Sequence, residues 1–367
     1  MDSRAALKAG TTLGFNDGWE YTITDELARG GSSIVYNAYY IDNLGARKTV
    51  RIKECYPFRC NLRRSSDGNL LIPEAERKQF TQTKQKMRRA YQLGNEFFAA
   101  DGLTNLTANT YNIYEANRTL YVVSVYAQGQ ELSYDRYSSV KDSIAAVKSA
   151  ATAISKIHNK GFLYLDIKPS NILTLEGTTE LIQLFDFDTV VPISDVPELR
   201  DKISFTKGFA ALELQRGDGK RIGTHTDVYG IGALLFYMLF DRVPDAFDCD
   251  TGARYDFSRS TLSGGAYRDA LTFRLTDFFH HTLADYYLDR FSNMETVVEK
   301  LSELQALADL SARYVVSSKI YGPEFFLGRE QETAWLTQRL LDAPGGCSFL
   351  VGMGGIGKST LARHCIR

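Results

Sequence analysis

The stretch FLYLDIKPSNIL, residues Phe162 to Leu173, carries the strongest functional signal in this chain of 367 residues. Within a few positions it offers a carboxylate, an ammonium and a side-chain amide, on Asp166, Lys168 and Asn171. A second carboxylate, Asp186, follows in LFDFD, and Lys53 ends an apolar strand far upstream. Phosphoryl transfer uses these groups as a base that orients a hydroxyl, as cations near developing charge, and as oxygen ligands for Mg²⁺. The pattern therefore indicates a phosphoryl-transfer site.

The chain before this stretch is predicted to be rich in strands. The runs EYTIT, SIVYNAYYI and RKTVRIK within residues 20–53 are rich in β-branched and aromatic residues. Residues 61–72 predict a small hairpin about Asp67-Gly68, and the charged residues 76–100 predict a helix. YVVSVY predicts one further strand, and residues 1–18 are expected to form a loose arm.

The chain after this stretch is predicted to be helical. Apolar residues recur at spacings of three and four between residues 144 and 157 and again between residues 291 and 310, which is typical of amphipathic helices. Ser292 and Glu295 are expected to form a capping box at the start of the second helix.

The composition favours a soluble, reduced, cytoplasmic protein. The net charge of −1 provides no global attraction to nucleic acid or to a membrane surface. The five cysteines are odd in number and contain no CxxC pair, and the first ten residues lack a signal-peptide core. The longest apolar run, Tyr229 to Phe240, is far shorter than the about 20 residues that a bilayer requires. We therefore expect no nucleic-acid or membrane partner.

The order of a glycine loop, a strand lysine, D-x-K-x-x-N and D-F-x resembles the signature set of the eukaryotic-like Ser/Thr protein kinases. The resemblance covers roughly residues 19–306. It implies an α+β, two-lobed protein kinase fold, with a small β-rich N-lobe over residues 19–126 and a larger helical C-lobe over residues 127–306.

The resemblance also implies roles, with ATP and Mg²⁺ as cofactors and a protein as substrate. Lys53 would bind the α- and β-phosphates, Asp166 would accept the proton of the substrate hydroxyl, and Lys168 would stabilise the transferred group. Asn171 and Asp186 would hold Mg²⁺, and Glu96 would pair with Lys53. The other residues that the resemblance places around the nucleotide are Gly30, Gly31, Ser32, Val35, Ser124, Tyr126 and Leu173.

Four further residues match supporting positions of the same family. Thr206 would face the catalytic aspartate, and Asp227 would brace the loop that carries it. Glu213 would close the activation segment by pairing with Arg290.

The sequence departs from the family pattern at several positions. The glycine loop reads ARGGSS, and Arg51 replaces the usual small residue two before Lys53, where it would crowd the adenine. Tyr164 and Leu165 replace the histidine and arginine before the catalytic aspartate, which places the chain in the non-RD type. The glycine after Asp186-Phe187 is Asp188, and the proline before Glu213 is Leu212.

Three functions compete at this point: an active protein kinase, a nucleotide-binding pseudokinase scaffold controlled by a downstream NTPase module, and a small-molecule kinase. All five charged or metal-binding positions remain, which favours activity. Thr206 followed by GFAALE suggests a peptide-binding activation segment, which disfavours a small molecule as substrate.

The last residues contain a second phosphate-binding pattern. Gly352, Gly357, Lys358 and Ser359 match GxxxxGK[ST], and with the preceding GREQETAWL they resemble the start of STAND and NB-ARC signalling NTPases. We expect a linker over residues 307–326 and an incomplete P-loop NTPase start over residues 327–367. Because no Walker B carboxylate follows, this loop is expected to be inert, and the rest of a longer chain is an expected partner.

Overall fold

The computed structural model describes residues 2–99, 110–125, 129–137, 139–175, 182–198, 205–250, 252–257, 268–320, 329–342, 350, 351, 358, 361, 362 and 365. It divides into two compact units, Met1–Ser311 and Ala312–Arg367. Within the described parts of the chain, none of the helices combines the length and the apolar character needed to cross a bilayer.

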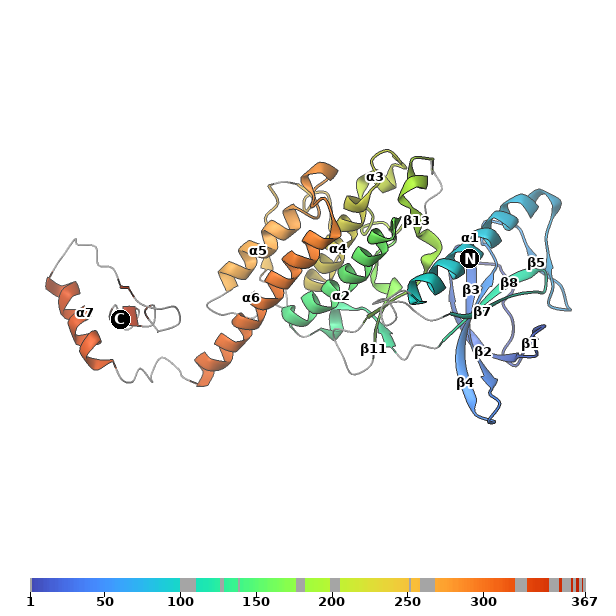
Figure 1. Ribbon diagram of the computed structural model, residues 1–367, viewed down its shortest axis with the longest axis horizontal. Helices are drawn as coiled ribbons and strands as arrows, with labels where there is room; N and C mark the ends of the chain where they lie inside the picture. Colours follow the sequence, from blue (N-terminus) through green and yellow to red (C-terminus); the bar gives the residue numbers. More distant parts are fainter. Residues whose placement is uncertain are drawn as a thin grey trace. The chain divides into compact units, whose positions relative to one another are not determined.

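The N-lobe is built on one antiparallel sheet, which contains the strands predicted within residues 20–53 and at residues 121–126 and two further strands, β1 and β7 (Figure 1). Its strands lie in the order β1 (Thr12–Gly14), β2 (Glu20–Arg29), β3 (Ser33–Ile41), β4 (Arg47–Cys55), β8 (Thr119–Val125) and β7 (Thr110–Ala116).

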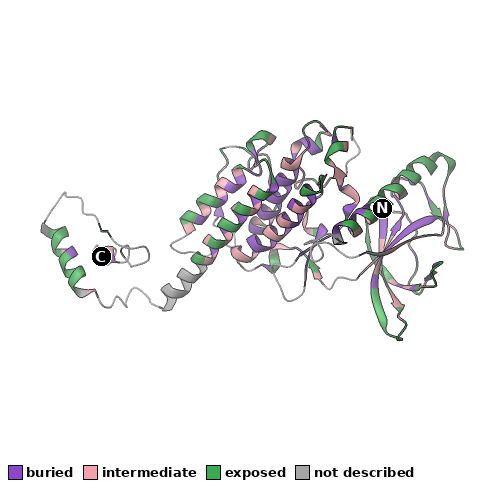
Figure 2. Ribbon diagram, viewed as in Figure 1, coloured by how far each residue is buried: buried purple, intermediate pink, exposed green. Residues whose placement is uncertain are grey.

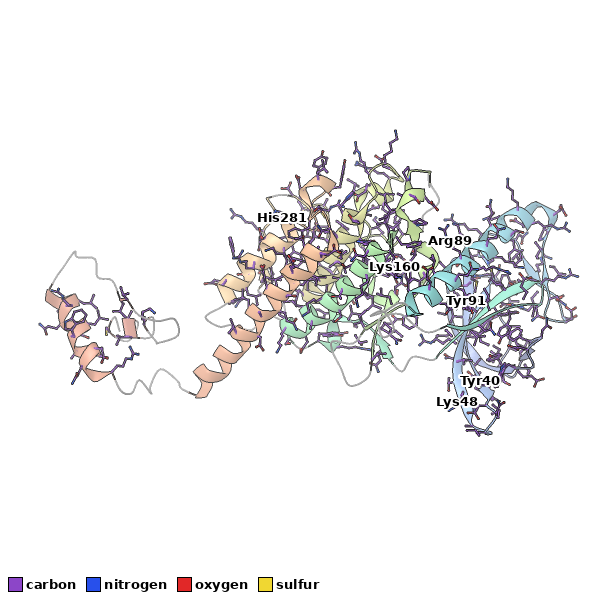
Figure 3. All side chains as sticks on the ribbon, viewed as in Figure 1. Tyr40, Lys48, Arg89, Tyr91, Lys160 and His281 are labelled. Carbon is purple, nitrogen blue, oxygen red and sulfur yellow. The ribbon has the colours of Figure 1, made fainter. Side chains whose placement is uncertain are left out.

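The two faces of this sheet differ because side chains alternate along each strand. Ile34, Tyr36 and Ala38 of β3 are fully buried in the N-lobe core. The opposite face of β3 carries Val35, which lies directly across from Lys53 of β4. Further along the same hairpin, Tyr40 lies opposite Lys48, as the labelled side chains allow the reader to follow (Figure 3).

The N-terminal segment is not the loose arm that the sequence predicted. Strand β1 pairs with β2, and Leu7, Leu13 and Phe15 are buried in the core of the sheet. Phe15 stacks on Tyr114 with 3.9 Å between ring centroids. The segment folds onto the sheet because these apolar side chains gain more from burial than the short chain loses in freedom.

The hairpin about Asp67-Gly68 is confirmed as β5 (Arg63–Arg64) and β6 (Leu70–Leu71). Arg64 reaches from it to the fully buried Glu54 of β4, with 2.6 Å between Nη2 and Oε2. The hydroxyls of Tyr36 and Tyr121 donate to the same carboxylate at 2.8 Å each. The pairing and these donations satisfy a charge that would otherwise be costly to bury.

Helix α1 (Arg77–Ala99) joins the cores of the two lobes. Phe80 and Met87 pack into the core of the N-lobe, whereas Leu93 and Phe97 pack into the core of the C-lobe.

The C-lobe is helical, and its most buried elements are α2 and α4 (Figure 2). The predicted apolar face of α2 is confirmed, since Ile144, Val147, Ala151, Ile154 and Ile157 are all fully buried. The helices of this lobe are α2 (Val140–Asn159), α3 (Leu212–Gln215), α4 (Thr224–Phe240), α5 (Arg268–His280) and α6 (Met294–Ile320). The C-lobe also contains two small sheets. In one, β9 (Gly129–Glu131) and β12 (Ile182–Leu184) flank β11 (Ile172–Leu175), and in the other β10 (Phe162–Leu163) pairs with β13 (Val191–Pro192).

Helix α6 corrects two expectations. Its N-cap is Asn293, whose Oδ1 accepts from the main-chain nitrogen of Thr296 at 2.9 Å, and not Ser292. Glu295 instead accepts from the hydroxyl of Ser155 on α2 at 2.9 Å, so it joins two helices rather than closing a capping box. The helix also continues through Ile320, so most of the expected linker is helical.

The second unit contains α7 (Glu330–Asp342), over the segment that precedes the terminal phosphate-binding pattern. Leu336 and Leu361 are buried in it, whereas Trp335 is exposed. Lys358 lies in a helical turn, and Gly352, Gly357 and Ser359 fall outside the described residues.

Candidate active site

The loop that carries Asp166 is held by Asp227 of α4, as the sequence predicted. The Asp227 carboxylate accepts from the main-chain nitrogens of Tyr164 and Leu165 at 2.8 Å each, and it is only 1% exposed. Leu165 has a φ of 65°, which is rare for a residue with a Cβ. Backbone strain of this kind persists where the surroundings impose it and is concentrated at functional sites.

Asp166 is the centre of a buried polar cluster. One carboxylate oxygen accepts from the Thr206 hydroxyl at 2.9 Å. The other accepts from Lys168 Nζ at 2.7 Å and from Asn171 Nδ2 at 3.0 Å. Lys168 also donates to Thr206 at 3.2 Å. The structure therefore brings together four of the residues that the spacing singled out.

A second charged cluster joins Lys53 to two carboxylates. Lys53 Nζ lies 2.9 Å from Asp186 Oδ1 and 2.7 Å from Asp188 Oδ2. Burial alone would lower the pKa of Lys53, but the two carboxylates raise it above its ordinary value. Burial and the neighbouring Asp186 raise the pKa of Asp188. For Asp186 the attraction of Lys53 outweighs burial, so its pKa is lowered and it is held as a carboxylate.

The donor atoms of these clusters fit a magnesium–nucleotide complex. Asn171 uses its amide nitrogen to bond Asp166, and no bond among the described residues uses its side-chain oxygen. Asp186 offers carboxylate oxygens as further ligands, and Mg²⁺ favours oxygen ligands of this kind. Among the described residues no group of three or more acidic, histidine or cysteine side chains forms a metal cage. A site of this kind suits an ion that takes its remaining ligands from phosphates and water.

The expected ion pair between Lys53 and Glu96 is not present. Glu96 is exposed on α1, and within the part of the chain that the structure describes Lys53 bonds only to the two aspartates. Two neighbouring positions of α1 lie against Phe187 instead: a Cβ added at Gly94 would lie 3.6 Å from its ring, and the Phe97 ring centroid is 5.8 Å away. The prediction failed because a helix position one or two residues away points to a different face.

The glycine loop is held by a residue that sequence reasoning missed. Arg4, which is 7% exposed, donates to the carbonyls of Gly30 at 2.9 Å and Ser33 at 3.3 Å, and also to the carbonyl of Tyr56. The main-chain nitrogen of Phe58 donates to the carbonyl of Gly31 at 2.8 Å. An arginine in an apparently unstructured N-terminal segment gave no signal in the sequence.

Two of the other residues expected around the nucleotide, Val35 and Ser124, lie on the face of the sheet that carries Lys53. Val35 and Lys53 are direct neighbours across β3 and β4, and Ser124 of β8 lies opposite Arg51 of β4. Leu173 is buried on β11 in the C-lobe. Tyr126 lies outside the described residues.

The sequence of this chain also matches a known protein family. The family model for the protein kinase domain matches residues 77–260, which is half of the chain. The chain belongs to the protein kinase family.

Curated kinases resemble this chain over part of their length. Serine/threonine-protein kinase D of Synechocystis sp. is 30% identical over 146 residues, which cover 38% of this chain and 28% of that protein. Ribosomal protein S6 kinase alpha-3 of Homo sapiens is 27% identical over 165 residues, which cover 42% of this chain and 22% of that protein. The chain thus matches less than a third of the length of either relative.

A solved structure supports the two-lobed kinase fold. The structure described as "PpkA-294 apo form" superposes with a TM-score of 0.61 and covers 82% of this chain and 99% of that one. At 22% identity this likeness concerns the fold alone.

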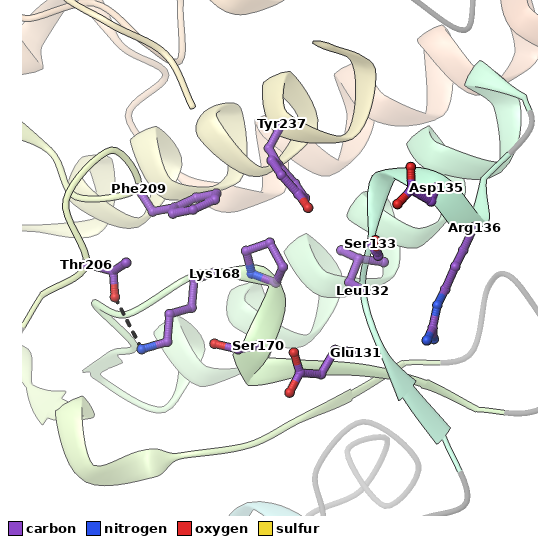
Figure 4. A pocket seen from close by; sticks show the side chains of 11 residues that line it. Glu131, Leu132, Ser133, Asp135, Arg136, Lys168, Ser170, Thr206, Phe209 and Tyr237 are labelled. Carbon is purple, nitrogen blue, oxygen red and sulfur yellow. Dashed lines mark hydrogen bonds between the residues drawn. The ribbon is translucent and has the colours of Figure 1, made fainter. Parts of the chain in front are cut away.

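Beside Lys168 of this protein kinase lies a pocket of about 590 Å³ (Figure 4). Lys168 and Thr206 line one end of it, where the figure draws the bond between them. Phe209 and Tyr237 form an aromatic wall, and Glu131 lies on the side of β9. Lys168 and Thr206, which bond to Asp166, thus connect this pocket to the Asp166 cluster.

The end of the kinase activation segment is anchored in the C-lobe. Arg290 binds Glu213 through two bonds, of 2.7 and 3.1 Å, and both side chains are almost fully buried. The Thr226 hydroxyl donates to the same carboxylate at 2.9 Å. The predicted pair between Glu213 and Arg290 is therefore present, and it fixes the segment that follows Thr206.

Proposed function

We propose that this protein kinase transfers the γ-phosphoryl group of ATP to Ser or Thr hydroxyls of proteins, including its own. The observation that carries the proposal is the cluster in which Asp166 meets Lys168, Asn171 and Thr206. A scaffold without phosphoryl transfer has no need to hold a carboxylate, an ammonium and an amide at these distances.

Asp166 would act on the substrate hydroxyl, and Lys53 and Lys168 would act on the phosphates. A substrate hydroxyl that replaces Thr206 at Asp166 Oδ1 would donate to this oxygen, which orients the hydroxyl and accepts its proton. Lys168 stays within reach of both groups and offsets negative charge on the transferred group. Lys53 would bind the α- and β-phosphates through its ammonium group, and Asn171 and Asp186 would hold the metal. Mg²⁺, when bound, neutralises charge that develops between the phosphates.

The pocket beside Lys168 supports a peptide rather than a small molecule as substrate. Its aromatic wall and its volume of about 590 Å³ suit side chains that flank the accepting hydroxyl. The alternative is a pseudokinase scaffold that binds nucleotide without transfer, and Asp188 beside the metal ligands is the departure that favours it.

Activity of the non-RD type follows from the position of Leu165. This residue is 4% exposed and carries no charge, so it provides no partner for a phosphate on the activation segment. We therefore propose that transfer does not depend on phosphorylation of that segment.

The experiment is incubation of the whole chain with labelled Mg-ATP, with Asp166→Asn as the control variant. Label on Ser or Thr in the unchanged chain, and its loss in Asp166→Asn with nucleotide binding retained, is the expected result. Equal labelling of both proteins would contradict the role of Asp166. Nucleotide binding without any labelling would favour the scaffold.

We further propose that the kinase is the effector part of a larger cytoplasmic signalling protein of the STAND type. The support is the sequence of the second unit, in which α7 precedes the pattern that ends in Lys358 and Ser359. We propose that this pattern binds no nucleotide by itself.

A further inference from the structure

Lys53 lacks the carboxylate that a helix of the N-lobe was expected to provide. Glu96 is exposed, whereas the neighbouring Gly94 and Phe97 of α1 lie near Phe187. An ammonium on a long, flexible stem needs a fixed acceptor to stay in one place, because four rotatable bonds otherwise spread its positions. Some other group must therefore position Lys53.

Asp188 provides an acceptor in that place. Its Oδ2 lies 2.7 Å from Lys53 Nζ, closer than the 2.9 Å between Lys53 and Asp186. The hydroxyl of Ser32 in the glycine loop donates to the same oxygen at 3.4 Å. One carboxylate thus contacts both the strand lysine and the loop that would cover the phosphates.

The backbone around Asp188 is itself held firmly. The preceding Phe187 packs against Phe97 of α1 and against Tyr164, with ring centroids 5.8 and 6.0 Å away. The following residue, Thr189, donates through its hydroxyl to the carbonyl of Tyr164 at 3.0 Å. A carboxylate on such a turn is placed with little freedom, as a positioning group requires.

We propose that Asp188 positions Lys53 for the nucleotide phosphates, in place of a carboxylate on α1. The proposal rests on the proposed function of the site as an ATP-binding kinase centre. Two acceptors share one lysine in this cluster. If Asp186 held the metal, Asp188 would keep Lys53 in place, so the metal ligand and the lysine anchor would be separate residues.

Two other roles for Asp188 make different predictions. A carboxylate that merely repels the phosphates would weaken nucleotide binding whether or not Lys53 is present. A third metal ligand, or a purely structural group, would support nucleotide binding whether or not Lys53 is present. Only a group that acts through Lys53 changes the sign of its effect when Lys53 is removed.

The test is a double-mutant cycle on binding of magnesium with adenylyl imidodiphosphate, a non-hydrolysable ATP analogue, measured by calorimetry on the whole chain. Asp188→Asn is made in the unchanged chain and in a Lys53→Met background. Glu96→Gln is the matched change of carboxylate to amide on α1. Asp188→Gly is a second variant in case the amide disturbs folding, and thermal unfolding checks every protein.

In the unchanged chain we expect Asp188→Asn to weaken binding about tenfold or more, since a hydrogen-bonded charge is lost at Lys53. In the Lys53→Met background we expect the same change to tighten binding about threefold or more, because it removes an unpaired negative charge near the phosphates. Glu96→Gln should bind as the unchanged chain does.

Tighter binding in both backgrounds would overturn the proposal in favour of simple repulsion, and weaker binding in both would overturn it in favour of a metal ligand or a structural role. A loss confined to Glu96→Gln, or no binding by the unchanged chain, would also overturn it. The binding assay requires no phosphoryl transfer. If the chain binds the analogue but transfers no label to protein, the proposed activity is refuted, and the double-mutant cycle still decides the role of Asp188.

Discussion

Replacing Arg290 by methionine should strongly destabilise the C-lobe. The guanidinium makes two bonds to Glu213 and donates through Nε to the carbonyl of Ala284 at 2.7 Å. The side chain of Arg290 is 0% exposed and that of Glu213 is 4% exposed, so water cannot replace the lost partner. Removal of one partner from a buried pair costs about 3–5 kcal/mol, because the remaining charge stays buried.

This loss can be measured as a shift in the thermal midpoint. In a domain of this size, about 1 kcal/mol corresponds to roughly 2 °C or more, so Arg290→Met should lower the midpoint by about 6–10 °C. Calorimetry or circular dichroism on the whole chain would measure it. Kinase activity should fall with it at moderate temperature, since Glu213 holds the end of the segment that carries Thr206.

A matched control separates burial from charge. Lys300→Met removes the partner of Glu303 on α6, where the two side chains are 36% and 58% exposed. We expect this control to change the midpoint by about 1 °C or less, since exposed pairs contribute little. The double variant Glu213→Met with Arg290→Met should recover part of the loss, because no unpaired charge remains. A midpoint for Arg290→Met within 2 °C of the unchanged chain would refute the reasoning.

Three further predictions concern the nucleotide. Arg4→Gln should raise the KM for ATP about threefold or more in steady-state kinetics, because the loop carbonyls of Gly30 and Ser33 lose a charged donor; an unchanged KM would show that the arm does not hold the loop. Ser124→Phe should reduce inhibition by bulky purine analogues about tenfold or more, because the added ring fills space beside the adenine; equal inhibition would mean that Ser124 does not line the pocket. Lys358→Ala should leave nucleotide stoichiometry and affinity unchanged in calorimetry, whereas Lys53→Ala should weaken affinity; a second site lost in Lys358→Ala would contradict an inert P-loop.

The catalytic loop could be predicted because its geometry is local. Asp166, Lys168 and Asn171 lie within one short loop, so their spacing nearly determines which atoms meet. The brace from Asp227 and the pair between Glu213 and Arg290 connect distant segments. They were predicted only through the resemblance to protein kinases, since composition and periodicity give no information on long-range partners.

The failures lie where a residue's partner depends on packing of the whole lobe. Arg4 is in a polar segment that shows no strand or helix pattern. In the structure it is nonetheless buried and donates to a carbonyl of the glycine loop. The N-cap of α6 was predicted one residue too early, because Ser292 and Asn293 are both favourable N-cap residues. Which of them caps the helix depends on the direction of the backbone after Phe291. Local sequence cannot decide between two adjacent caps of similar strength.

If Asp188 takes the role expected of Glu96, the site keeps an acceptor for Lys53 although that acceptor comes from a different segment of the chain. A lysine that faces phosphates requires a fixed acceptor, and the turn after Phe187 brings a backbone position close to Lys53. A glycine at position 188 would provide no acceptor for Lys53. An aspartate provides a carboxylate on a short side chain with few rotatable bonds. Helix α1 then does not have to supply a carboxylate, which agrees with the exposed position of Glu96 and with Gly94 and Phe97 lying near Phe187. The aspartate that a motif comparison marks as a defect is, on this argument, the reason that the exposed glutamate is harmless.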